Sequence, residues 1–268
     1  MAQLIDHKSA ALVKTLVVAD SGFGKTGALA SLAKAGYNLY IIDFDNGLDV
    51  LRNLLKDDPK ALARVQYETF VDKFKNVGGQ LMIDGVPTAF ANALKILSNW
   101  PGKGSLDTWT DNDVLVIDTL TTMGQAAMRG ILSLVGRDGK AQIQDWGAAM
   151  DQVERMVQLL ATPACNCNVI LNCHIQYAET TEGSGIFKGY PAALGNKLSP
   201  KIPVYFNNCL VGKSTGLGAN KKREFMTKGD GLVEGKASAV TVPVTLPQDT
   251  GLAEFFKILR SGKVPSPG

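Results

Sequence analysis

The chain has 268 residues, of which 45% are hydrophobic and 20% are charged, and its formal net charge at pH 7 is +3. This composition is typical of a soluble globular protein, and so small a net charge excludes an argument for nucleic-acid binding from total charge alone. No apolar run approaches the length of about 18 residues that a membrane span needs, and residues 1–8 lack the pattern of a secretory signal. We therefore expect a cytoplasmic protein without a membrane partner.

The first motif is a glycine-rich segment between an apolar run over residues 13–18, which predicts a strand, and an Ala/Leu-rich segment over residues 27–35, which predicts a helix. Strand, glycine-rich turn and helix form the context of a phosphate-binding P-loop, in which backbone N–H groups and the helix N-terminus attract an anion. Ala19 stands where the first glycine of the motif usually lies. The residues predicted to bind the nucleotide are Asp20, Ser21, Gly22, Phe23, Gly24, Lys25, Thr26 and Gly27.

Four residues of this motif have predicted roles toward a nucleotide and its metal ion. Lys25 would reach the β- and γ-phosphates, and the Thr26 hydroxyl would coordinate the metal ion. Gly22 and Gly24 would allow positive φ angles, so that the backbone can approach the phosphates closely. We therefore expect ATP and Mg²⁺ as cofactors.

Short apolar runs that alternate with helices predict an α/β fold, with a mostly parallel central sheet and helices on both faces. The second such run, residues 39–42, is followed by Asp43 and Asp45, at the edge where parallel sheets collect ligands. The segments that come next are a helix over residues 48–56, a strand over 65–70, a helix over 87–100 and a polar loop over 101–113.

The next apolar run, residues 114–117, ends in Asp118, which is the Walker B form of a strand that brings a carboxylate to Mg²⁺. The neighbouring Thr119 cannot accept a proton at neutral pH, so a carboxylate for hydrolysis must come from another strand. Asp43 and Asp45 are the candidates, and they point the same way because side chains alternate along an extended chain.

Two predicted helices follow, with apolar residues at spacings of three and four. The apolar positions are Leu120, Met123, Ala127, Ile131 and Leu134 in the first, and Ile143, Trp146, Met150, Val153, Val157 and Leu160 in the second. We expect both stripes, including Trp146, to pack in the core rather than to form a groove for a partner helix. A short basic loop, residues 136–140, lies between them.

The cysteines favour a core strand over a metal site. Cys167 and Cys173 alternate with apolar residues on a predicted strand that ends in His174, and buried cysteine acts as a small hydrophobe. A metal site formed by Cys165, these two cysteines and His174 is the less favoured alternative, because the paired C-x₂-C spacing of zinc sites is missing. Disulfides are not expected in a reducing compartment.

The last third of the chain differs in composition from the rest. Residues 175–190 are rich in Thr, Gly and Glu and have too little apolar surface to order themselves. The segments predicted after them are a strand over 203–211, its partner strand over 223–227 in a C-terminal β-hairpin extension, and a closing helix over 252–259. We expect one domain, with an N-terminal segment over 1–12, a core over 13–260 and a frayed tail over 261–268.

Residues 42–49, Ile-Asp-Phe-Asp-Asn-Gly-Leu-Asp, resemble the RecA/recombinase core, in which a strand next to the P-loop strand ends in D-x-E followed by a Leu-Asp pair. Asp45 takes the place of the catalytic glutamate and is one methylene shorter. His174 stands where the family has a polar γ-phosphate sensor, usually Gln. The loop over 136–140 and the segment after His174 correspond to the first and second DNA-binding loops of the family.

Residues 203–211, the hairpin and Gly235-Lys236 are similar to the compact phage annealing recombinases of the Sak four type, which consist of the RecA core without extra domains. Members of the wider family carry a K-x-R finger that acts on the nucleotide of a neighbouring subunit. Lys236 matches the lysine of that finger, and Ser238 stands in place of its arginine. DNA-stimulated hydrolysis is therefore expected to be slow, and a phage-encoded protein would act in the host cytoplasm.

The resemblance implies an ATP- and Mg²⁺-dependent recombinase or annealing ATPase that acts in DNA recombination and repair. Its implied partners are single-stranded DNA, further copies of the chain in a ring or filament with ATP at the subunit junctions, and a single-strand-binding protein. The implied catalytic residues are Lys25, Asp45, His174 and Lys236, and the implied metal ligands are Thr26 and Asp118. The implied DNA contacts are Arg137, Lys140, Phe187 and Lys188.

Each of these assignments has an alternative. Asp45 could cap the helix that begins near Leu48, His174 could be a histidine at the edge of the core, and Lys236 could be a solvated lysine in a turn. The whole protein could be a hexameric DNA helicase or loader ATPase, or an ATP-gated binding module without hydrolysis. A small-molecule P-loop kinase is a further alternative, although the chain lacks an arginine-rich lid.

Overall fold

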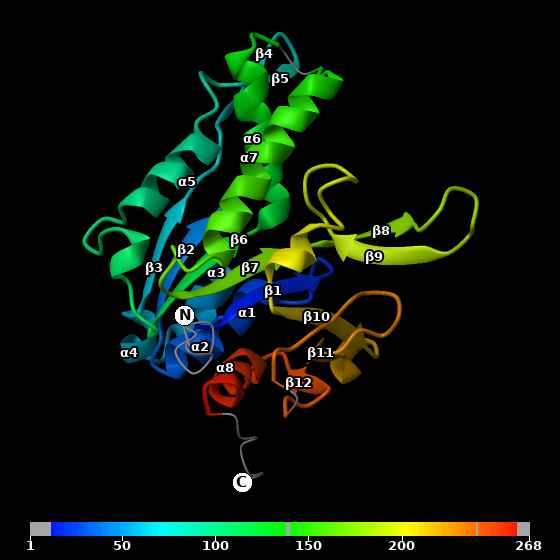
Figure 1. Ribbon diagram of the computed structural model, residues 1–268. Helices are drawn as coiled ribbons and strands as arrows, with labels where there is room; N and C mark the ends of the chain where they lie inside the picture. Colours follow the sequence, from blue (N-terminus) through cyan, green and yellow to red (C-terminus); the bar gives the residue numbers. More distant parts are fainter. Residues whose placement is uncertain (1–11, 138–139, 240, 262–268) are drawn as a thin grey trace, which may run out of the picture.

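A mostly parallel sheet organises the fold. The computed structural model describes residues 12–137, 140–239 and 241–261, and these residues form an eight-stranded sheet with the order β12-β11-β10-β1-β7-β6-β2-β3 (Figure 1). The strands are β1 (Lys14–Ala19), β2 (Asn38–Asp43), β3 (Val65–Thr69), β6 (Asp113–Asp118), β7 (Asn168–Cys173), β10 (Asn208–Thr215), β11 (Lys222–Met226) and β12 (Thr245–Pro247). Neighbouring strands from β10 to β3 are parallel, whereas β11 and β12 are antiparallel. The predicted α/β class is confirmed.

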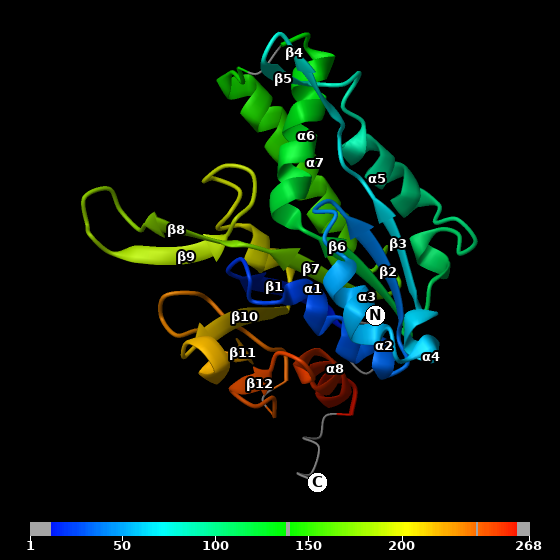
Figure 2. The ribbon, with the colours of Figure 1, turned by 180° about the vertical axis from the view of Figure 1, so that it is seen from behind.

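Helices cover both faces of this sheet (Figures 1 and 2). The helices on one face are α1 (Lys25–Ala28), α2 (Ala30–Lys34), α3 (Asp49–Leu55), α4 (Pro59–Leu62) and α8 (Gly251–Ser261). The helices on the other face are α5 (Ala89–Ser98), α6 (Leu120–Leu134) and α7 (Ile143–Ala161). Because strand side chains alternate, Leu16 and Val18 of β1 pack into the second group and Val17 into the first. The apolar runs of the sequence are therefore buried on both sides.

The strand order corrects one expectation. The resemblance to the RecA core placed the strand before Asp45 next to the P-loop strand, but β2 lies between β6 and β3, and β7 and β6 separate it from β1. The residues that follow β1, β2, β6 and β7 still meet at one edge, because these strands are parallel and share their carboxyl ends. The separation of β2 from β1 changes which strands support the site, but the site still lies at the carboxyl edge of the sheet.

In the part of the chain that the structure describes, two hairpins stand outside the main sheet. The pair β4 (Phe74–Val77) and β5 (Gln80–Ile83) is joined by Gly78 and Gly79, both at positive φ, and the sequence analysis did not predict it. The pair β8 (Ile175–Glu179) and β9 (Phe187–Pro191) lies in the segment that was predicted not to order itself. That prediction is wrong, because the hairpin is held by its main-chain ladder and by Glu179, whose carboxylate accepts hydrogen bonds from the N–H groups of Gly183 and Gly185.

Two other predictions require correction. Leu134, Ile143 and Trp146 are 80%, 93% and 40% exposed, so these three members of the predicted stripes do not pack in the core. Helices α6 and α7 extend beyond the sheet, and the buried apolar residues of α7 begin at Ala149. The strand predicted over residues 203–211 begins later, at β10, because residues Ile202–Tyr205 form a 3₁₀ helix. Pro203, which lacks an N–H donor, fits the first turn of such a helix.

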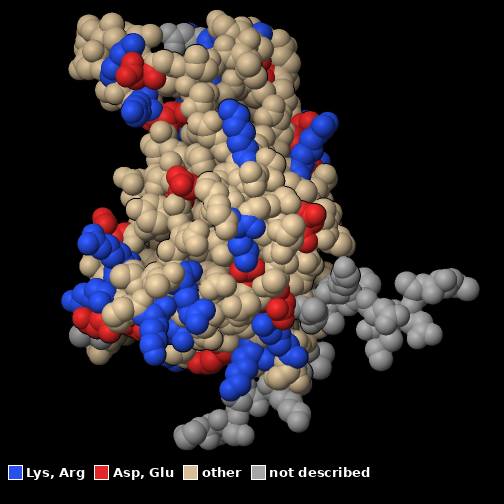
Figure 3. Space-filling view, turned by 90° about the vertical axis from the view of Figure 1, so that its left-hand side faces the viewer, with Lys and Arg blue, Asp and Glu red and all other residues tan. Residues whose placement is uncertain are grey.

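Some predicted segments lie outside the described residues. They are residues 1–11 of the N-terminal segment, 138–139 of the basic loop and 262–268 of the tail. Figure 3 shows Lys and Arg side chains interspersed with Asp and Glu side chains on one face of the molecule.

Gly212 permits close packing between β10 and the P-loop. A Cβ atom at this position would lie 2.6 Å from the Ala19 Cβ and 2.7 Å from the Phe23 ring. We expect Gly212→Ala to lower the free energy of unfolding by about 1–3 kcal/mol, because overpacking forces the neighbours apart. Chemical denaturation would measure this change.

The matched control is Gly147→Ala, at an exposed position of α7 where an added Cβ would meet nothing within 4 Å. This control should raise the free energy of unfolding by up to about 1 kcal/mol, since Ala has the higher helix propensity. Equal effects of the two substitutions would contradict the tight contact between Gly212 and the P-loop.

Candidate nucleotide-binding site

The P-loop connects β1 to α1 at the carboxyl edge of the sheet. Gly22 and Gly24 have φ angles of 76° and 97°, which are left-handed values that favour glycine. Phe23 turns inward, is 2% exposed and packs edge-to-face on Phe225 at 5.1 Å between ring centroids. Phe23, one of the residues predicted to bind the nucleotide, therefore offers a ligand only its main chain.

Lys25 lies in the mouth of the loop. Its Nζ donates to the carbonyl oxygens of Ala19 at 2.9 Å and Asp20 at 3.2 Å, and it lies 3.2 Å from His174 Nδ1. The side chain is largely buried, and this desolvation lowers the pKa of Lys25, whereas the nearby Asp118 raises it. A cation is thus held where the Walker motif places the β- and γ-phosphates.

Thr26 and Asp118, the two predicted metal ligands, are in direct contact. The Thr26 hydroxyl donates to Asp118 Oδ2 at 2.6 Å, and Asn172 Nδ2 donates to Asp118 Oδ1 at 3.1 Å. Burial raises the pKa of Asp118, and these two hydrogen bonds oppose that effect. The other end of the Asn172 amide, Oδ1, is buried without a hydrogen-bond partner among the described residues.

Asn172 was missed by the sequence analysis, although a signal was present. It follows three consecutive apolar residues of β7, and it lies two residues before His174, at a spacing that places both side chains on the same side of the strand. Because Asn172 is a polar residue on the side of the strand that carries His174, the sequence could have identified it as a second candidate for the site.

The two aspartates after β2 have different surroundings. Asp43 is buried, and its carboxylate accepts hydrogen bonds from the N–H of Asp45 at 3.0 Å and from the Thr69 hydroxyl at 3.2 Å. Burial raises the pKa of Asp43, and the bond from the Asp45 main chain opposes it. Asp45 is exposed and accepts hydrogen bonds from the Thr122 and Thr119 hydroxyls at the start of α6, the latter at 3.4 Å. Asp43 thus holds the turn, and Asp45 is the carboxylate that faces solvent.

His174 lies directly after β7 and is fixed through its main chain. Its N–H donates to Thr121 Oγ1 at 3.3 Å, and its carbonyl oxygen accepts from Ala192 N at 2.7 Å. Burial and the Lys25 cation lower the pKa of His174. The ring is therefore neutral near pH 7 and can accept a hydrogen bond from Lys25 at Nδ1.

This pKa shift predicts a pH dependence of stability. A histidine whose pKa is lowered by folding stabilises the protein fully above its unfolded pKa of about 6.5, and that contribution is lost as the pH falls below it. We expect the thermal midpoint of the nucleotide-free protein to fall between about pH 7 and pH 5, and the fall to be smaller in His174→Gln. Thermal unfolding followed across this range would measure it, and identical pH profiles for the two proteins would contradict the lowered pKa.

The remaining predicted residues lie apart from the loop. Arg137 forms an ion pair with Asp145, whose carboxylate also accepts a hydrogen bond from the N–H of Gln142 before α7. Lys140 is exposed, and Phe187 is 55% exposed on β9. The structure therefore leaves Lys140 and Phe187 accessible, while the Arg137 guanidinium has an acidic partner.

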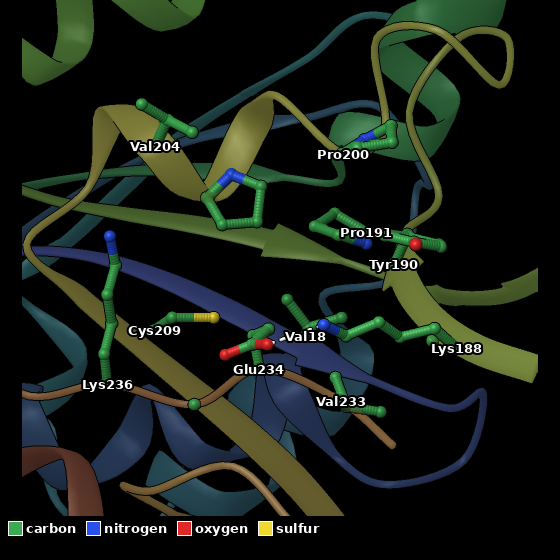
Figure 4. Close-up of a pocket in the computed structure, with 13 residues that line it drawn as sticks. Val18, Lys188, Tyr190, Pro191, Pro200, Val204, Cys209, Val233, Glu234 and Lys236 are labelled. Carbon is green, nitrogen blue, oxygen red and sulfur yellow. Dashed lines mark hydrogen bonds and ion pairs between the residues drawn. The ribbon is translucent and has the colours of Figure 1, made fainter. Parts of the chain in front are cut away.

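Lys236 and Lys188 line a pocket of about 280 Å³ beside β1 and β10 (Figure 4). Lys188 Nζ pairs with Glu234 Oε1 at 2.6 Å, which raises the pKa of Lys188. Lys236 is exposed, and its main chain pairs with that of Cys209. The Lys236 side chain thus lies at the edge of the pocket and, unlike that of Lys188, is not paired with Glu234.

Gln248, which precedes α8, is a further contact that the sequence analysis missed. Its Nε2 donates to the carbonyl oxygen of Gly24 at 2.7 Å across a sequence separation of 224 residues. No local pattern marks it, because the contact depends on how the C-terminal segment returns to the P-loop.

The described residues offer neither a cluster of metal ligands nor a membrane span. They contain no group of three or more His, Cys, Asp or Glu side chains that could hold a metal ion, and none of their helices is long and apolar enough to cross a membrane. Cys165, Cys167, Cys173 and Cys209 are buried, free thiols. Burial raises the pKa of Cys173 and of Cys209 to about 12, so both are protonated.

Comparisons with known proteins give a family. No curated protein matches the sequence. Similar solved structures include a KaiC-like protein from the hyperthermophilic archaeon Pyrococcus horikoshii OT3, at 10% identity and a TM-score of 0.40, with 80% of this chain and 77% of that chain covered. Another is the flagellar accessory protein FlaH from Methanocaldococcus jannaschii, at 10% identity and a TM-score of 0.44, with 89% and 87% covered. The AAA_24 family model, described as an AAA domain, matches residues 11–236. The chain therefore belongs to the AAA_24 family of AAA domains and is a P-loop NTPase domain.

Proposed function

We propose that the protein hydrolyses ATP with the help of Mg²⁺. One observation carries this proposal: the P-loop, β6, β7 and the segment after β2 bring Lys25, Thr26, Asp118, His174 and Asp45 to one edge of the sheet. These groups supply a cation for phosphates, oxygen ligands for a metal ion, a neutral imidazole and an exposed carboxylate. Phosphoryl transfer needs such positioning and charge stabilisation rather than covalent chemistry.

The residues beside the P-loop fit Mg²⁺. This ion prefers oxygen ligands and, in nucleotide sites, takes one or two protein ligands together with phosphate oxygens and water. Thr26 and Asp118 offer a hydroxyl and a carboxylate in contact, and Asn172 fixes the second carboxylate oxygen. Bound there, Mg²⁺ would neutralise phosphate charge.

Asp45 is the proposed base toward the attacking water. It is exposed at the mouth of the site, and the Thr122 hydroxyl holds one of its carboxylate oxygens. The free oxygen can accept a hydrogen bond from water and orient it toward the γ-phosphate. His174, in contact with Lys25, would contact the same phosphate and so report whether it is present.

The direct test is metal removal. The purified protein should release phosphate from ATP in the presence of Mg²⁺, release should stop with EDTA, and added Mg²⁺ should restore it. ATP binding without any Mg²⁺-dependent release would favour a gated binding module over an ATPase.

We further propose that the ATPase is of the recombinase or annealing type, assembles head to tail and binds single-stranded DNA. The β8–β9 hairpin begins directly after His174 and exposes Phe187 and Tyr177, so a change at the γ-phosphate can reach aromatic groups able to stack on bases. Lys236 is exposed and free to act on the nucleotide of a neighbouring copy.

This finer proposal predicts a loss of DNA binding in Phe187→Ala. Base stacking on an aromatic side chain is worth about 1–3 kcal/mol, so affinity for single-stranded oligonucleotide in the presence of ATP should fall by about tenfold. Phe74→Ala is the matched control, because Phe74 is 56% exposed on the other hairpin. Fluorescence anisotropy would measure binding.

Electron microscopy with an ATP analogue and oligonucleotide separates the rival assemblies. Filaments or rings on single-stranded DNA would support the recombinase proposal, whereas rings that translocate along DNA would favour a helicase or loader. Monomers unaffected by DNA would favour a small-molecule kinase.

A further inference from the structure

Next to Thr26, which contacts Asp118, the P-loop helix presents Gly27, and three side chains converge on this glycine. An added Cβ atom on Gly27 would lie 3.2 Å from Leu54 Cδ1, 3.6 Å from Val50 Cγ2 and 3.8 Å from Gln248 Nε2. Helix α3 and the segment before α8 are remote in sequence, yet both reach this one point. The glycine leaves room for them directly beside the phosphate-binding turn.

Val50 and Leu54 form an apolar surface there. They are 44% and 49% exposed, although the next residues of α3, Leu51 and Leu55, are buried in the core. Residues four apart lie on the same side of a helix, so Val50 and Leu54 present one continuous apolar surface. The flat face of an aromatic ring matches such a surface in size and polarity.

Gln248 supplies the polar group beside this surface. Its main-chain N–H donates to the Arg223 carbonyl at 3.1 Å, which fixes the backbone, and its Nε2 donates to Gly24 at 2.7 Å. The bond to Gly24 orients the amide and engages one of its two N–H donors. Its Oε1 accepts no hydrogen bond from the described residues and is the end of the amide left for a ligand.

The direction of the triphosphate follows from the other side of the loop. Lys25, His174 and Asp45 mark the γ-phosphate end, and the backbone of the turn holds the α- and β-phosphates. The nucleoside must therefore leave the loop away from these three groups. The surface beside Gly27 lies next to the loop on a different side of the helix from Asp118.

We propose that the base of the bound nucleotide lies on Val50 and Leu54 and that Gln248 Oε1 accepts a hydrogen bond from its exocyclic amino group. The inference rests on the proposed binding of a triphosphate in the P-loop. An acceptor at this position favours adenine over a base that carries a carbonyl oxygen at the same place, because two acceptors facing each other leave both unpaired. Gln248 would thus select the base and also brace the loop through Gly24.

The test compares ATP with inosine triphosphate, which has the same ribose and phosphates but a carbonyl in place of the amino group. The unmodified protein should bind ATP about tenfold more tightly, the factor that one lost hydrogen bond with an unpaired acceptor produces. In Gln248→Met, of similar shape but without either polar group, the ratio of the two affinities should fall to about one. Calorimetric titration gives both constants, and their ratio cancels any general change in the loop.

Tripolyphosphate separates this inference from the proposal on which it rests. Leu54→Ser should lower the affinity for ATP relative to that for tripolyphosphate by about tenfold, while the ratio of the affinities for ATP and inosine triphosphate persists. The control is Leu159→Ser, at a 39% exposed position of α7, which should change neither of these two affinity ratios. An unmodified protein without base preference, or an unchanged ratio in Gln248→Met, would overturn the inference. Failure of both tripolyphosphate and ATP to bind would instead remove the P-loop function itself.

Discussion

Lys25→Met is expected to weaken ATP binding by about 100-fold and to reduce turnover to background, because it removes the cation that lies in the mouth of the P-loop. Methionine retains the length and the apolar stem of the buried lysine, so the packing around β1 and α1 should persist. Calorimetric titration with ATP and a phosphate-release assay measure the two effects.

Lys34→Met is the matched control. Lys34 is an exposed cation at the end of α2, only one short helix away from Lys25, and the same substitution there removes the same charge and length. Binding and turnover should remain unchanged in this control. If Lys25→Met bound ATP as well as the control did, with the same thermal midpoint, the nucleotide site proposed at the P-loop would be wrong.

The sequence predicted the parts of this site that depend on local pattern. Three local patterns each mark the carboxyl end of a buried strand. They are the glycine-rich turn of the P-loop, the apolar run that ends in Asp118 and the apolar run that is followed by His174. Parallel strands share that end, so the pattern alone is enough to bring Thr26 and Asp118 together. The Thr26 hydroxyl lies 2.6 Å from Asp118 Oδ2, whereas the role of the two residues as metal ligands stays a prediction.

Contacts that depend on the return of distant segments were not predictable. Gln248 and Thr122 belong to a C-terminal connection and a helix start whose local sequence has no functional signature. The order of strands was missed for a similar reason, because the apolar pattern of β2 is compatible with a place beside either β1 or β6. Pairing partners are selected by the whole sheet rather than by the strand.

Apolar content predicted neither the order of a polar segment nor the burial of an apolar helix face. It predicted that residues 175–190 would not order themselves, but hairpin β8–β9 is held by main-chain hydrogen bonds that need no apolar surface. It also predicted a buried Trp146, although periodicity shows only that a helix has an apolar face. Whether that face is covered depends on the length of its neighbours, and α7 begins beyond the edge of the sheet.

Asp45→Asn is expected to reduce kcat by about 100-fold or more while the affinity for ATP remains within a few-fold of the original. Asparagine keeps the size of the side chain and still accepts a hydrogen bond from Thr122, but its amide cannot take a proton from water. An effect on kcat without one on binding is the signature of a group that acts in the transition state. Steady-state phosphate release and calorimetric titration of ATP measure the two quantities.

The control for charge alone is Asp57→Asn, which makes the same change at an exposed position after α3 and should leave kcat unaltered. Thr122→Val adds an intermediate case, because the Asp45 carboxylate would remain but lose the hydroxyl that orients it. Its kcat should fall by less than that of Asp45→Asn. Unchanged turnover in Asp45→Asn would leave Asp43 as the alternative carboxylate after β2, but that group is buried and already accepts hydrogen bonds from the turn and from Thr69, so water could approach it only if the turn after β2 opened. The location of the base would then depend on a rearrangement of the loop rather than on the arrangement that places Asp45 beside Thr122.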